Sequence, residues 1–159
     1  MIVAFRHLAH DNTTLDTIDS FFTNSNYVHI QIIFSNCQVG GAWIKKGVQF
    51  RSISNTIIYP FLWDFVEVND LDETKVYQHI QSKLGEKFSI FGSFGMRLFP
   101  VKKKNMWYCS DIIFSSLLAG GLKTKLGYLN SIAISPQKIY DILTKENNYK
   151  LVRYNDCRI

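Results

Sequence analysis

The feature that most constrains the fold is an apolar run at residues 112–119. It follows a Cys-Ser-Asp sequence directly and ends at Gly120-Gly121. Such a run predicts a buried helix, and the two glycines are typical of a helix C-terminus. Cys109 then stands at the start of that helix. Free N–H groups and the helix dipole at this end favour a thiolate over a thiol, which is how a cysteine becomes a nucleophile.

A nucleophilic thiol needs a base that is close in space, wherever that base stands in the sequence. His29 opens a strand-like run at residues 29–34 and is the best candidate for this base. His7 and His10 are expected in a turn after the first strand and give only a weak metal signal, so no metal site is predicted. His79 falls in a predicted amphipathic helix and is expected to face solvent.

Gln31 is the candidate for a third catalytic residue. It projects from the same face of the predicted strand as His29, because residues two apart on a strand share a face. Its amide oxygen can accept the imidazole N–H and fix the tautomer of the ring. A solvent-facing strand residue is the alternative interpretation. If residues 35–38 form a tight hairpin, Ile44 and Ala42 fall opposite His29 and Gln31, and neither side chain can form a hydrogen bond.

The composition indicates one folded domain over residues 1–159. The chain is 47% hydrophobic, and its three cysteines are too few for a disulfide framework, which favours a reducing compartment. We expect no signal peptide, no transmembrane segment and a cytoplasmic location. Residues 80–159 hold 13 Lys and Arg against 5 Asp and Glu, whereas residues 1–79 hold 5 against 8. This basic half raises nucleic-acid binding as a hypothesis, but no recognisable motif supports it.

The order of the predicted elements is that of an α+β fold, with an antiparallel meander of strands between helices. Pro60 predicts an edge position or an irregular start for the fifth strand. The second helix is expected to carry Val76, Ile80 and Leu84 and to end near Gly85. Strands are expected at residues 2–8, 29–34, 39–44, 48–53, 57–68 and 149–154. Helices are expected at residues 11–22, 70–85, 109–119 and from 135 onward, and a loop or short helix at residues 88–100.

Six short segments form a pattern through their order and spacing. They are Tyr-Val-His-Ile-Gln at 27–31, Gly-Val-Gln-Phe-Arg at 47–51, Trp-Asp-Phe at 63–65, Gly-Glu-Lys-Phe-Ser-Ile-Phe-Gly at 85–92, Trp-Tyr-Cys-Ser-Asp at 107–111 and Ser-Pro at 135–136. The pattern resembles the circularly permuted papain-like cysteine amidases and peptidases of the NlpC superfamily, particularly small members from phages and other viruses. Three positions depart from it: Val28 replaces Ser, Gln31 stands where Glu is frequent, and Phe88-Ser89 replaces Tyr-Asp.

The resemblance implies a single permuted papain-like domain that cleaves an amide or related acyl bond through an acyl-enzyme on Cys109, with His29 as base. Tyr108, Ser110 and Phe88 would line the substrate site. The partner would be a peptide, amide or lipid acyl substrate, no cofactor is expected, and a viral member would act in a host cell or virion. Two alternatives stay open: a catalytically inactive binding module with the same fold, which the departures favour, and a lipid acyltransferase or thioesterase.

Overall fold

The computed structural model describes residues 1–7, 25–88, 106–126 and 134–154. The order of their elements confirms the α+β prediction, because a six-stranded antiparallel sheet is accompanied by three α-helices. From edge to edge, the strands are β4 (Gly47–Ser52), β3 (Gln38–Trp43), β2 (Tyr27–Ile33), β1 (Ile2–His7), β5 (Trp63–Glu67) and β8 (Lys150–Val152). A separate parallel pair joins β6 (Lys87–Phe88) to β7 (Met106–Trp107).

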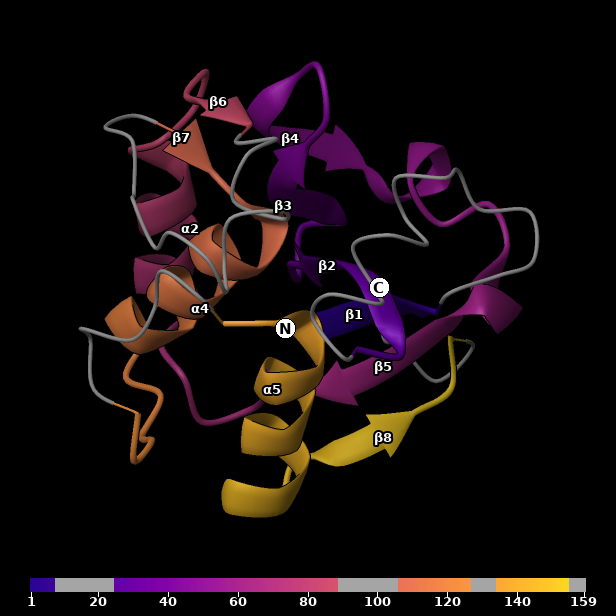
Figure 1. The fold of residues 1–159 in the computed structure, drawn as a ribbon, viewed down its shortest axis with the longest axis vertical. Coiled ribbons are helices and arrows are strands. Elements are labelled where there is room, and N and C mark those ends of the chain that lie inside the picture. Colours follow the sequence, from indigo (N-terminus) through magenta and orange to yellow (C-terminus); the bar gives the residue numbers. More distant parts are fainter. Residues whose placement is uncertain (8–24, 89–105, 127–133, 155–159) are drawn as a thin grey trace.

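The helices begin and end at local signals in the sequence (Figure 1). They are α2 (Glu73–Gln81), α4 (Cys109–Ala119) and α5 (Pro136–Asp141), together with the short turns η1 (Ile53–Asn55), η2 (Pro60–Leu62) and η4 (Ile142–Glu146). The side chains of Asp72 and Ser135 cap α2 and α5, since each accepts a hydrogen bond from the backbone N–H three residues on. α4 ends at the predicted glycine pair, with Gly121 in the left-handed region at φ +101°.

The sheet separates two apolar clusters. Val3 and Phe5 of β1 belong to the cluster that also contains the buried residues of α2, α4 and α5. Ile2 and Ala4 belong to the other cluster, because successive side chains of a strand point to opposite faces. We call the first side of the sheet the helical face and the second the far face. Residues of the β4–β5 connection and of the C-terminal segment, among them Ile57, pack against the far face.

Two details of the predicted elements have a definite outcome. Pro60 begins η2 and the strand starts only at Trp63, so the irregular start of the fifth strand is confirmed. α2 ends at Gln81, so the predicted end near Gly85 is wrong, and Leu84 lies beyond the helix with 47% of its surface exposed. The helix expected at residues 11–22 and most of the segment 88–100 lie outside the described residues, as do His10, Cys157 and Ser89.

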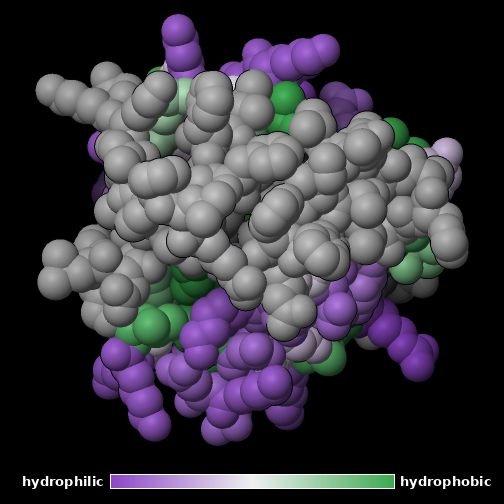
Figure 2. Space-filling model, in the orientation of Figure 1, coloured by the Kyte–Doolittle hydropathy of each residue, from purple (hydrophilic) through white to green (hydrophobic). Residues whose placement is uncertain are grey.

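The outer side of α5 and η4 is polar. Lys138 and Lys145 are exposed there, whereas Ile139 and Ile142 are fully buried. Figure 2 shows hydrophilic side chains gathered over the lower part of the molecule, where α5 and η4 lie in Figure 1. Within the described ranges, no helix has the length and apolar character required to cross a membrane.

Candidate functional site

α4 begins at Cys109, as the sequence predicts. Its N-cap residue is Tyr108, whose side chain forms no capping hydrogen bond. This distinguishes α4 from α2 and α5, which Asp72 and Ser135 cap. The N-cap side chain therefore leaves the N–H groups of the first turn to other acceptors, such as a thiolate or the oxyanion of a reaction intermediate.

The predicted substrate residues gather at this end of α4. The rings of Phe88 and Tyr108 meet edge to face with centroids 5.7 Å apart, because β6 and β7 pair side by side. Ser110 is buried in the first turn of the helix. Cys109 itself is only 8% exposed, so little of its side chain is open to a reagent or substrate. Asp111 is buried in the same turn, where its carboxylate faces the positive end of the helix dipole.

His29 lies on the far face of the sheet. Its ring packs against Trp43 and Trp63, with centroids 5.8 and 6.2 Å away. Trp63 belongs to the far-face cluster, whereas Cys109 belongs to the cluster of the helical face. The structure therefore does not bring the predicted nucleophile and the predicted base together.

A β-bulge interrupts β2 between Tyr27 and His29 and puts these two residues on opposite faces of the sheet. Arg6 of β1 pairs with His29, but the next residue, His7, pairs with Tyr27, so Val28 is an extra residue in β2. Tyr27 points to the helical face and His29 to the far face, although regular alternation would put both on the same face. The sequence motif alone carries no signal for this bulge.

The surroundings of His29 keep its imidazole neutral. Burial, followed by the nearby charges of Arg6 and Arg51, lowers the pKa of His29 to about 4. Among the described residues, its Nε2 atom is closed to solvent and has no hydrogen-bond partner. Arg51 stacks over the indole of Trp43, with its guanidinium carbon 4.6 Å from the ring centroid.

Gln31 shares the far face with His29, as predicted, but forms no hydrogen bond with it. The side chain is fully buried, so the solvent-facing interpretation is wrong. Both amide atoms, Oε1 and Nε2, lack a hydrogen-bond partner among the described residues. An unsatisfied buried amide is unfavourable by about 1–3 kcal/mol.

The residues opposite His29 and Gln31 differ from the predicted ones by one position. Ile32 pairs with Gly40 across β2 and β3, and this register sets Gly41 opposite Gln31 and Trp43 opposite His29. The shift arises because Phe34 N–H donates to Gln38 O and closes a three-residue loop. In that loop Cys37 adopts a left-handed φ of 63°, which nothing in the sequence predicts.

The position of His79 differs from the one that the sequence predicts. It is not solvent-facing: its Nε2 is buried, and its ring meets Trp107 edge to face at 6.4 Å. The N–H of Asp72 donates to the carbonyl of Gly120, so α2 and α4 run antiparallel and the last turn of α2 lies near the first turn of α4. The position of His79 three residues after the buried Val76 is the one sequence signal that places it at the margin of the buried face.

A second cluster of polar side chains lies at the C-terminal end of β1. The Tyr27 hydroxyl donates to Asp64 Oδ2 over 2.6 Å, and His7 Nε2 lies 3.2 Å from Asp64 Oδ1. Burial, with the hydrogen bond to Asp64, raises the pKa of Tyr27, so its phenol stays protonated and donating. Within the described part of the chain, no group of three or more His, Cys, Asp and Glu side chains is arranged to hold a metal ion.

Comparison of this chain with protein-family models, curated proteins and solved structures found no match. The resemblance to the NlpC superfamily therefore rests on the sequence motifs and stays a prediction. Over the described residues the fold is α+β, with a six-stranded antiparallel sheet and three α-helices.

Proposed function

We propose that this protein is a cysteine hydrolase that cleaves an amide or related acyl bond. The observation that carries the proposal is the position of Cys109 as the first residue of α4, behind an N-cap side chain that does not cap. A base would take the proton of the thiol, and the thiolate would attack the acyl carbon. The protonated base would then return the proton to the leaving group, and water would release the acyl group from sulfur. The N–H groups of the first turn suit both the thiolate and the oxyanion.

Two histidines compete for the role of base. The family resemblance favours His29, which lies on the opposite face of the sheet from Cys109 and would have to change face to approach it. The geometry favours His79, because it packs against Trp107, two residues before Cys109. A base and its nucleophile must lie within hydrogen-bond reach of one another, directly or through one water.

The acyl-enzyme is the direct test. A variant with Cys37→Ser and Cys157→Ser retains Cys109 as its single thiol and is incubated with p-nitrophenyl acetate or an acetyl thioester. We expect stoichiometric acetylation of Cys109, located by peptide mass, and slower release of the acetyl group by water. Adding Cys109→Ala should abolish it. Absence of acetylation, or equal acetylation of Cys37 in the unaltered chain, would contradict the proposal.

Separate variants identify the base. His29→Ala or His79→Ala should lower the acetylation rate by about 10²–10⁴-fold, whichever residue moves the proton. His7→Ala is the matched control, since His7 is paired with Asp64, and should change the rate little. If neither His29→Ala nor His79→Ala slows acetylation, a Cys–His mechanism is wrong.

A non-catalytic binding module is the second candidate function. The separation of His29 and Cys109 by the sheet favours it, as does the low exposure of the thiol. A binding module predicts a thiol that does not react with activated esters in any of these variants.

A further inference from the structure

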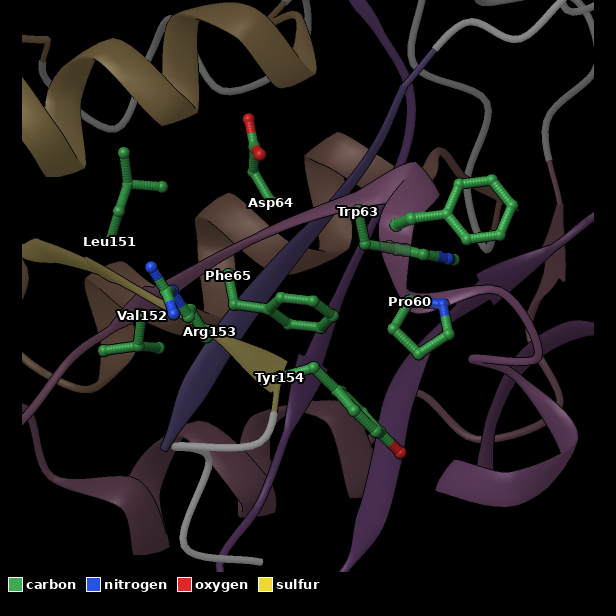
Figure 3. Close-up of a pocket in the computed structure, with 9 residues that line it drawn as sticks. Pro60, Trp63, Asp64, Phe65, Leu151, Val152, Arg153 and Tyr154 are labelled. Atoms are coloured by element: carbon green, nitrogen blue, oxygen red, sulfur yellow. The ribbon is translucent and has the colours of Figure 1, made fainter.

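The cavity drawn in Figure 3 lies on the far face of the sheet. Trp63, Phe65 and Tyr154, which line it, belong to the far-face cluster. Cys109 belongs to the cluster of the helical face, so the sheet separates this cavity from the thiol. The side chains that act on Cys109 are therefore to be sought among those that hold the start of α4 on the helical face.

Trp107, two residues before Cys109, is held by three side chains. Its indole N–H donates to Oε2 of Glu86. The ammonium of Lys83 lies over the ring, with Nζ 5.7 Å from the centroid, and the His79 ring meets the indole edge to face. The Trp107 side chain is also buried in the cluster of the helical face. These contacts hold the indole in one orientation relative to the start of α4.

Glu86 is itself fixed to β4 through its backbone. The N–H of Val48 donates to the carbonyl of Glu86, and the N–H of Gly85 donates to the carbonyl of Val48, each over 2.9 Å. This close approach requires a glycine at position 47, because its φ is +70° and a Cβ there would clash with the carbonyl oxygen of Glu86. The Glu86 carboxylate therefore reaches Trp107 from a backbone that β4 holds in place.

Trp107 contacts one member of the Cys–His pair and is close in sequence to the other. The chain continues from it through the N-cap residue Tyr108 to Cys109. His79, which packs against the indole, belongs to the last turn of α2, near the first turn of α4. A base must keep its nitrogen within hydrogen-bond reach of the thiol proton, and a displacement of about 1 Å can lower a rate by about 100-fold. The orientation of the indole therefore bears on the reaction.

We propose that Glu86 is a positioning residue of the hydrolase site. By accepting the indole N–H of Trp107, Glu86 holds the ring against which His79 packs, and so keeps the imidazole directed at the thiol of Cys109. This role requires an acceptor oxygen but no negative charge. The inference rests on the proposed function, with His79 as the base, and assigns Glu86 an action through Trp107 and not on the reacting atoms.

The test is the acetylation rate as a function of pH in the variant in which Cys109 is the single thiol. Glu86→Ala removes the acceptor, whereas Glu86→Gln keeps an acceptor oxygen without the charge. Trp107→Phe keeps an aromatic ring and removes the donor. Glu146→Ala, at an exposed position of η4, is the matched control. Circular dichroism and urea denaturation establish that each variant is folded.

A base that takes the thiol proton lowers the pH at which the thiolate forms. We therefore expect Glu86→Ala and Trp107→Phe to raise the midpoint of the pH profile by about one pH unit, and to slow acetylation roughly tenfold below the midpoint. The rates should converge above about pH 9, where the thiolate forms without a base. Glu86→Gln should restore the profile of the unaltered chain, and Glu146→Ala should leave it unchanged.

A second comparison tests the route of the effect. In a chain that already carries His79→Ala, Glu86→Ala should slow acetylation no further, because residues that act through one another are not additive. An unchanged profile in Glu86→Ala, an equal loss in Glu86→Gln, or a loss that persists above about pH 9 would overturn this inference alone. Absence of acetylation of Cys109 in the unaltered chain would overturn the hydrolase assignment together with it.

Discussion

The two faces of the sheet differ in the hydrogen bonding of their buried polar groups and in how completely their side chains fill the space. The helical face is closed by three helices, and Phe5, Phe114 and Leu117 are fully buried there. The far face buries the amide of Gln31 and the Nε2 of His29 without partners among the described residues, and it opens into a cavity. The comparison indicates that the helical face supplies stability, whereas the far face retains features that binding would explain better than stability does.

The largest effect is expected from a truncation on the helical face. Phe114 of α4 is fully buried in the cluster that joins the helices to the sheet. Phe114→Ala should lower the free energy of unfolding by about 3–5 kcal/mol, through lost transfer energy and a cavity. Urea denaturation measures this change. A loss below about 1 kcal/mol would show that the helical face does not dominate stability.

The next largest effect is a pH dependence from His29 on the far face. An unfolded imidazole has a pKa near 6.5, whereas burial holds that of His29 at about 4. Between these values the unfolded chain binds a proton that the folded chain does not, so the unfolding free energy falls as the pH is lowered. The fall should reach about 3 kcal/mol between pH 6.5 and pH 4. His29→Leu should remove this part of the pH dependence, and an NMR titration midpoint near 6.5 would contradict it.

A smaller effect of opposite sign is expected at Gln31. Gln31→Leu keeps a similar volume and removes a buried amide that has no partner, so it should raise the unfolding free energy by about 1–3 kcal/mol. Gln78→Leu, at an exposed position of α2, is the matched control and should change stability little. Destabilisation by Gln31→Leu in urea denaturation would mean that the amide has a partner in solution.

The smallest effect is the difference in stability expected between alanine substitutions of two adjacent glycines of β3, which face opposite sides of the sheet. A Cβ on Gly40 would lie 2.9 Å from Ile80 Cδ1 and 3.0 Å from two aromatic rings of the helical face. A Cβ on Gly41 would meet only the end of the Trp43 ring at 3.3 Å. Gly40→Ala should therefore lower the free energy of unfolding by about 1–3 kcal/mol through overpacking. Gly41→Ala should lower it by less than about 1 kcal/mol. Equal unfolding midpoints for the two variants would remove the distinction between the faces.

Signals confined to a few residues were sufficient to predict the elements. Each of these signals acts on its own turn of helix. They are the apolar run at residues 112–119, the glycine pair after it, and the capping residues Asp72 and Ser135. α4 begins at Cys109 and α5 begins after Ser135, as the sequence predicts, whereas α2 is shorter at both ends than the predicted 70–85. The positions of Tyr108 and Cys109 at the start of α4 follow from the same local signals, whereas Phe88 reaches them through the pairing of β6 with β7.

The pairing of strands was less predictable because it depends on single residues. Val28 is the extra residue of a bulge, so Tyr27 and His29 lie on opposite faces of the sheet although they are two residues apart. Cys37 adopts a left-handed conformation that shortens the hairpin by one position and brings Trp43, not Ile44, opposite His29. His79 was missed because its partner, Trp107, comes from a segment distant in sequence.

The most direct test of the central claim, that α4 activates Cys109, is the rate of its alkylation as a function of pH. Iodoacetamide is applied to the variant with Cys37→Ser and Cys157→Ser, and intact mass follows the reaction. Cys37, an exposed turn residue, is the reference in a variant with Cys109→Ala and Cys157→Ser. The account predicts a rate that is half-maximal below pH 7 for Cys109. A midpoint near the ordinary cysteine value of about 8.5 would contradict it.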